Sequence, residues 1–94
     1  HEAPAEYAMS SNVSNSLIAN GCIIEGTVEN SIIFRGVKVR KGAIVKNSII
    51  MQKGDIEEGA QVENIITDKQ VIITKDQIIT ARKKPTVIKK EEVV

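Results

Sequence analysis

The chain has 94 residues, a formal net charge of +1 and two aromatic residues, Tyr7 and Phe34. Its length fits one small domain. The near-zero charge gives no electrostatic case for nucleic acid or an anionic membrane as a partner, and two aromatics argue against a surface that stacks bases or sugars. No stretch resembles a signal peptide or a membrane span, and the single Cys22 cannot form an internal disulfide. These features are compatible with a cytoplasmic protein.

Residues 1–12 contain Pro4 and two serines but no apolar periodicity. We therefore interpret residues 1–12 as a linker from a preceding domain that is absent from this sequence. The unusual start, with His1 followed by Glu2, suggests the edge of an excised piece.

An internal repeat of seventeen residues organises the centre of the chain. The segments 28–44 and 45–61 share an identical residue in seven of their seventeen columns. A third copy starts at Val62, and an earlier copy, two residues shorter, starts at Val13. Four coils are therefore expected at about 13–27, 28–44, 45–61 and 62–78, since repetition at this scale indicates a solenoid.

Each repeat divides into three short strands that should form the three walls of a β-helix. Aliphatic anchors such as Ile50 recur every five or six residues, and a small residue such as Ser48 often stands two places before the anchor. Residues i and i+2 of a strand share one face, so both should point into a narrow interior, as should Cys22. The expected fold is all-β: a parallel β-helix of hexapeptide repeats over residues 13–80. The linker and a C-terminal strand near Thr86–Lys90, within a tail of residues 81–94, should cap it. The fourth coil has no glycine, and Asp68 and Asp76 are expected at its turns.

One column of apolar residues is expected to point outward. The residue before each Ile33-type anchor is aliphatic in every copy, and two further apolar residues lie just past the adjacent corner. Contiguous exposed apolar patches usually mark interfaces, although ordinary surface hydrophobes remain an alternative. The candidate interface consists of Leu17, Ile32, Phe34, Ile49, Met51 and Ile66.

The sequence offers no residues for catalysis, for a metal or for a cofactor. The only histidine is His1, so neither a Ser/His/Asp nor a Cys/His set can be assembled. There is also no Cys/His cluster for zinc. This argues against an acyltransferase of the hexapeptide class, which uses a histidine between coils. A third possibility, a passive structural solenoid, would be favoured by outward threonine ladders, and the outward column is aliphatic instead.

The repeat region resembles the C-terminal β-helix domain of the ADP-glucose pyrophosphorylase (glucose-1-phosphate adenylyltransferase) family. The matching words are NSLIANGCIIEGTVENSIIFRGVKV, KGAIVKNSIIMQ, DKQVII and TVIKK, and together they span residues 15–90. The combination of the first word with the VIKK ending is most similar to the auxiliary, D-type subunits for glycogen biosynthesis. Family corner glycines are replaced here by Arg40 and Glu57, and the glycine after VIKK by Glu91.

The resemblance implies a left-handed β-helix that packs on a nucleotidyltransferase domain missing here, builds an oligomer and contributes to an allosteric site. The whole protein would be a subunit of an enzyme that makes ADP-glucose, with little or no catalysis of its own. Implied partners are the missing domain, a catalytic C-type subunit or further copies, and a sugar-phosphate effector. Two lysines of the family motifs would hold the anionic effector, Lys69 in IITDK and Lys89 in TVIK; otherwise Lys69 is a solvated corner residue and Lys89 protects an edge strand.

Overall fold

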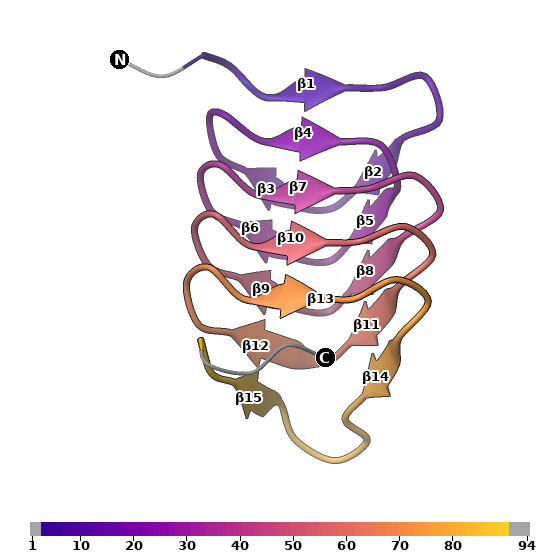
Figure 1. Cartoon of the computed structure of the whole chain (residues 1–94), viewed down its shortest axis with the longest axis vertical. Helices are drawn as coiled ribbons and strands as arrows, with labels where there is room; N and C mark the ends of the chain where they lie inside the picture. The colour runs from indigo at the N-terminus through magenta and orange to yellow at the C-terminus, as the bar shows by residue number, and fades with distance from the viewer. Residues whose placement is uncertain (1–2, 91–94) are drawn as a thin grey trace.

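The computed structural model describes residues 3–90 and consists of three parallel sheets that form the walls of a solenoid (Figure 1). Sheet A contains β1 (Glu6–Tyr7), β4 (Ile23–Ile24), β7 (Lys38–Val39), β10 (Asp55–Ile56) and β13 (Ile72–Ile73). Sheet B contains β2 (Asn12–Ser14), β5 (Thr27–Glu29), β8 (Ile44–Lys46), β11 (Gln61–Glu63) and β14 (Ile78–Thr80). Sheet C contains β3 (Leu17–Ile18), β6 (Ile32–Ile33), β9 (Ile49–Ile50), β12 (Ile65–Thr67) and β15 (Thr86–Ile88).

The winding is left-handed. In Figure 1 the chain crosses the front from left to right in β4, turns to the rear through β5 and β6, and returns one level lower in β7. Each strand inside a sheet pairs in parallel with the equivalent strands of the turns before and after it, as Val28 pairs with both Val13 and Val45. The all-β, parallel β-helix expected from the repeat is therefore confirmed.

The solenoid has about five turns, one more than the four coils visible in the sequence. The additional strands are β1, which lies within residues 1–12 and pairs with β4, and β15, which pairs with β12. Glu6 and Tyr7 carry no apolar pattern, so only their backbone pairing identifies them as a strand. The later part of the expected linker thus continues the stack.

The core is the stack of inward side chains. The aliphatic anchors and the small residues two places before them are buried together, as the periodicity indicated, and Cys22 is fully buried. The fully buried aliphatic side chains are Ile24, Val28, Ile33, Val37, Val39, Val45, Ile50, Ile56, Val62, Ile65, Val71 and Ile73. Because successive turns stack these residues in columns, a chain of this size buries a continuous core.

The corners rely on left-handed backbone conformations. Asn15, Asn30, Asn47 and Asn64 all have φ between 48° and 61°, a region that asparagine tolerates better than most residues. In the later turns Lys53, Gln70 and Asp76 also have positive φ. Asp68 and Asp76 both lie at corners of the fourth coil, as expected, but at the Asp68 corner the residue with positive φ is Gln70. Gly26 occupies the corner that is two residues short, where an added Cβ would lie 2.3 Å from the carbonyl oxygen of Ala43.

Candidate functional site

Sheet C carries a single outward column of five aliphatic side chains, one from each turn. The strand register aligns Leu17, Ile32, Ile49, Ile66 and Val87. Leu17 is 70% exposed, Ile32 40% and Val87 56%, whereas Ile49 and Ile66 are half-buried. We call these five residues the sheet C column. The sequence pattern had missed Val87, because residues 81–85 lengthen the last corner and break the period.

The other two sheets show no comparable column. The outward positions of sheet A are Glu6, Ile23, Lys38, Asp55 and Ile72. On sheet B the two outward columns mix residues such as Ile44 and Ile78 with Gln61, Lys46 and Glu63. The uninterrupted apolar character is therefore specific to sheet C and does not follow from the β-helix as such.

Phe34 and Met51 extend the apolar surface past the corner that follows sheet C. Phe34 is 38% exposed and Met51 is half-buried. Phe34 helps to line an open, almost wholly apolar groove of about 220 Å³ with Leu17, Ile18, Ala19, Ile32 and Ile33. The structure thus brings all six predicted interface residues to one side of the solenoid.

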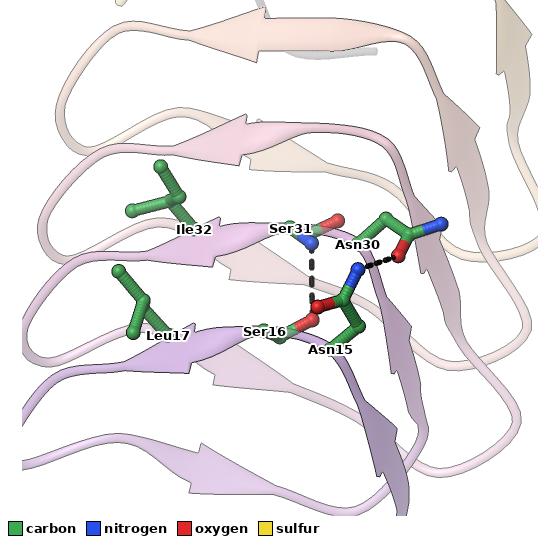
Figure 2. A pocket seen from close by; sticks show the side chains of 6 residues that line it. All are labelled: Asn15, Ser16, Leu17, Asn30, Ser31 and Ile32. Carbon is green, nitrogen blue, oxygen red and sulfur yellow. Dashed lines mark hydrogen bonds between the residues drawn. The ribbon is translucent and has the colours of Figure 1, made fainter.

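The opposite border of the column is polar. Figure 2 shows Asn15 donating a hydrogen bond from Nδ2 to Oδ1 of Asn30, and the backbone N–H of Ser31 donating to Oγ of Ser16 at 3.0 Å. Leu17 and Ile32 lie beside these pairs, on the sheet C strands that follow the corner. The side chains of Asn15 and Ser16 each bond to the equivalent residue of the next turn, so this border stabilises the corner.

The two lysines suggested for an anionic effector lie on adjacent turns at the corner between sheets C and A. Both Lys69 and Lys89 are exposed. The backbone N–H of Asp68 donates to the carbonyl oxygen of Ile88 at 2.7 Å, which extends the β12–β15 pairing by one residue. By this register Asp68 lies opposite Lys89.

Asp68 places a carboxylate in the middle of this corner. Its Oδ1 accepts the backbone N–H of Lys69 at 2.7 Å. A carboxylate beside both lysines opposes the binding of an anion at that point.

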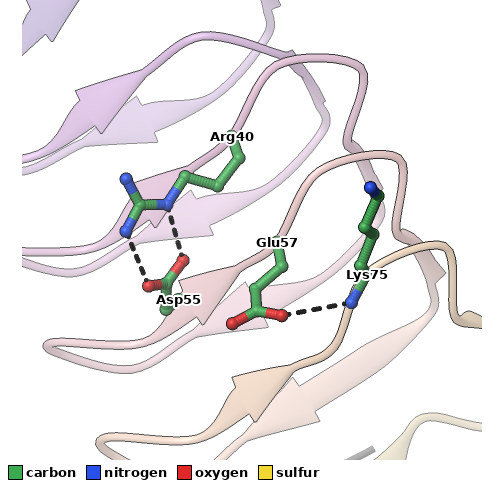
Figure 3. Close-up of polar contacts among 4 residues, drawn as sticks. All are labelled: Arg40, Asp55, Glu57 and Lys75. Atoms are coloured by element: carbon green, nitrogen blue, oxygen red, sulfur yellow. Dashed lines mark hydrogen bonds and ion pairs between the residues drawn. The ribbon is translucent and has the colours of Figure 1, made fainter.

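A charged corner lies between sheets A and B and contains Arg40 and Glu57. Arg40 forms a two-point ion pair with Asp55, through Nε at 3.0 Å and Nη2 at 2.9 Å, and Oε1 of Glu57 accepts the backbone N–H of Lys75 at 3.2 Å (Figure 3). The hydrogen bond to Asp55 raises the pKa of Arg40 above its already high ordinary value, so the guanidinium stays charged. Within residues 3–90 no group of acidic, histidine or cysteine side chains is arranged to hold a metal ion.

Comparison with known proteins assigns the solenoid to a family. The profile of the family described as "GlmU-like, C-terminal hexapeptide" matches residues 3–85. The chain belongs to this family. Within the described residues, this hexapeptide domain contains no helix able to cross a membrane.

Two curated relatives of the hexapeptide domain are named glycogen biosynthesis protein GlgD. The protein from Bacillus subtilis (strain 168) is 65% identical over 74 residues, which cover 79% of this chain and 22% of the relative. The protein from Geobacillus stearothermophilus is 61% identical over 44 residues, which cover 47% of this chain and 13% of the relative. A glucose-1-phosphate adenylyltransferase from the same organism is 46% identical over 46 residues, 49% of this chain and 12% of the relative.

These similarities confirm the resemblance to the C-terminal domain of the ADP-glucose pyrophosphorylase family, and to its D-type members in particular. The hexapeptide domain spans less than a quarter of the length of each of these relatives.

Proposed function

We propose that this chain is the regulatory and oligomerisation domain of a D-type subunit of glucose-1-phosphate adenylyltransferase. In the whole protein it follows a nucleotidyltransferase domain, acts in the cytoplasm and contributes surfaces rather than catalytic groups. Its partners are that preceding domain and either a catalytic C-type subunit or further copies of the same subunit.

The observation that supports an assembly role most strongly is the sheet C column. Five aligned aliphatic side chains without an intervening charge form a continuous apolar surface, and Phe34 and Met51 broaden it. Apolar surface buried on association contributes about 25 cal/mol per Å² before the costs of association. Aromatic residues and methionine are also enriched in the cores of interfaces. We therefore assign the sheet C column to contacts between domains or subunits.

A contribution to an effector site is the second part of the proposal. Lys69 and Lys89 lie on adjacent turns at one corner, and lysine is a suitable point charge for a phosphate. The adjacent Asp68 weakens such a site, so we expect weak binding of a phosphorylated sugar or phosphoglycerate. Lys69 would bind it together with Lys89 of the neighbouring turn.

The assembly role is tested by size-exclusion chromatography with light scattering on the 94-residue chain, alone and mixed with a catalytic C-type subunit. We expect co-elution as a defined hetero-complex. A chain that stays monomeric and elutes separately at concentrations of both proteins up to about 100 μM, where even weak specific interfaces are occupied, would contradict a role in joining subunits.

The effector role is tested by titrating 3-phosphoglycerate into three proteins: the wild-type chain, Lys69→Gln and Lys41→Gln. Lys41 is an exposed lysine at a different corner and serves as the matched control. We expect Lys69→Gln to weaken binding and Lys41→Gln to leave it unchanged. Equal binding by all three proteins would remove Lys69 from the effector site.

A further inference from the structure

The two ends of the solenoid close their cores to different extents. At the C-terminal end the inward residues of sheets A and C are covered, with Ile73 fully buried and Ile88 6% exposed, while Ile79 of sheet B is half-buried. At the N-terminal end Tyr7 is 53% exposed, and Val13 and Ile18 are only half-buried. Within residues 3–90, the apolar interior is therefore more open at the N-terminal end than at the C-terminal end.

The three residues at the open end are members of the core columns. Tyr7 pairs with Ile24, Val13 with Val28 and Ile18 with Ile33, and each of these partners is buried. Their side chains are thus on the inward side of the first turn, and their exposure arises because no further turn covers them. Figure 1 shows β1 at this end, above the rest of sheet A.

The same three residues carry the open backbone edge. The N–H groups of Glu6, Asn12 and Leu17 donate towards the second turn, to Cys22, Gly26 and Ser31. Alternate residues of a strand direct their backbone groups to opposite sides. The N–H and C=O groups of the intervening inward residues therefore face away from the stack, where none of the described strands lies.

The open end also lacks the charges that usually protect a strand edge. Residues 3–24 contain a single charged side chain, Glu6, whereas the opposite end carries Arg82, Lys83 and Lys84 on the loop before β15. Lysines and covering loops are common devices against edge pairing, and end repeats of a solenoid normally need a polar outer face. Residues 3–24 at the N-terminal end contain no lysine and no arginine.

We propose that the N-terminal end of the solenoid is a docking surface for the polypeptide that precedes residue 1 in the full-length subunit. This inference rests on the proposed function, because it requires the longer chain that the curated relatives possess. The described chain enters the fold at Ala3, beside β1, so a preceding segment reaches this end without a long connection.

The size of the end favours a covalently linked occupant over a free partner. The two shorter dimensions of the molecule are 25 and 23 Å. A roughly triangular end within them offers about 300 Å² of contact, compared with about 800 Å² per partner in a standard interface. A tethered segment can occupy such a small surface, since a short linker provides an effective concentration in the millimolar range. The occupant should present apolar side chains to Tyr7, Val13 and Ile18, and polar backbone groups to their open edge.

The test compares thiol labelling of Tyr7→Cys in the full-length subunit and in the 94-residue chain. A maleimide is added, and the labelled fraction of the peptide that contains residue 7 is followed by mass spectrometry. The control is Lys84→Cys, on the exposed loop at the opposite end. The native Cys22 is fully buried and should react slowly in both forms.

We expect Tyr7→Cys to react at least roughly tenfold more slowly in the full-length subunit, because labelling would require the docked segment to open. Lys84→Cys should react equally in both forms. Equally fast labelling of residue 7 in both forms would overturn the proposal. Slow labelling of the 94-residue chain that becomes fast on dilution would identify a second copy as the occupant and overturn it as well. Neither result depends on a partner subunit, so failure of the assembly role is detected separately by the co-elution experiment.

Discussion

The hydroxyl of Ser48 accepts the backbone N–H of Ile65 at 3.1 Å and donates to the carbonyl oxygen of Lys46 at 2.7 Å. The hydroxyls of Ser16 and Ser31 bond in the same way, each accepting the N–H of the residue one turn further along and donating to a carbonyl two residues before it. This series of serines links four turns at the corner between sheets B and C. The serines are thus small enough for the narrow interior and also satisfy buried backbone groups.

Ser48→Ala should destabilise the domain by about 1–3 kcal/mol, because the N–H of Ile65 would remain buried without an acceptor. Ser48 is 3% exposed, so water cannot easily replace the hydroxyl. The measurement is the free energy of unfolding from urea titration. Ser14→Ala, at an exposed position of β2, is the control and should change it by less than about 0.5 kcal/mol. Equal effects of the two substitutions would show that the hydroxyl of Ser48 is unimportant.

Ile65 and Thr67 exchange the sizes that the repeat prescribes. The equivalent residues one turn earlier are Ser48 and Ile50, small and then large, whereas β12 places Ile65 first and Thr67 second, both buried. Oγ1 of Thr67 accepts the backbone N–H of Met51 at 3.1 Å, so this buried hydroxyl has a partner. The total volume is nearly conserved, which explains how the core tolerates the exchange.

The double variant Ile65→Ser/Thr67→Ile should be more stable than the sum of its single variants suggests. Ile65→Ser creates a cavity, at a cost of about 2–4 kcal/mol, and Thr67→Ile overpacks the same region, at a cost of about 1–3 kcal/mol. Together they restore the small-then-large order of the repeat. A double-mutant cycle on unfolding free energies should show a favourable coupling of at least about 1 kcal/mol. Strict additivity would mean that the two positions do not share one packing site.

Asn47 should be replaceable by glycine but not by alanine. Its φ of 48° lies in the left-handed region, which a Cβ without a compensating side-chain amide disfavours by about 1 kcal/mol. We therefore expect Asn47→Ala to lower the thermal midpoint clearly and Asn47→Gly to leave it within a few degrees. If alanine were tolerated as well as glycine, the backbone requirement would not explain the repeated asparagine.

Removal of the Arg40–Asp55 ion pair should lower the free energy of unfolding only slightly, by an amount that does not change with pH near neutrality. The side chains are 36% and 24% exposed, so Arg40→Met should cost less than about 1 kcal/mol, and less again at high salt. Asp55 raises the pKa of Arg40, and a group with a raised pKa stabilises the fold at every pH below its unfolded value. The cost should therefore be constant between pH 6 and 9 in urea titrations. A cost that changes steeply in this range would show that another group titrates with the pair.

The inward and outward faces could be derived from the sequence because each small residue and its anchor follow a period of two within a strand. This reasoning correctly predicted that Cys22 is buried and that Leu17 and Ile32 point outward. The first strand could not be recognised, since Glu6 and Tyr7 are held by backbone pairing with β4 rather than by side-chain burial.

The candidate site was only partly accessible from the sequence. Val87 lies beyond a lengthened corner, so its alignment with Ile66 depends on pairing that no fixed period shows. The position of Asp68 opposite Lys89 likewise follows from the extended β12–β15 register. The family motifs contain the two lysines and Asp68, but they do not show that Asp68 lies opposite Lys89 on the next turn.

The central claim, that the sheet C column is an assembly surface, is tested most directly by the affinity of the chain for its C-type partner. Ile32→Lys is compared with Ile72→Lys, since Ile32 on sheet C is 40% exposed and Ile72 on sheet A is 38% exposed. Both variants should fold, because each ammonium group can reach solvent. We predict that Ile32→Lys weakens binding by roughly tenfold or more and that Ile72→Lys binds like the wild-type chain. Unchanged affinity of a folded Ile32→Lys variant, or equal losses in both variants, would contradict the account.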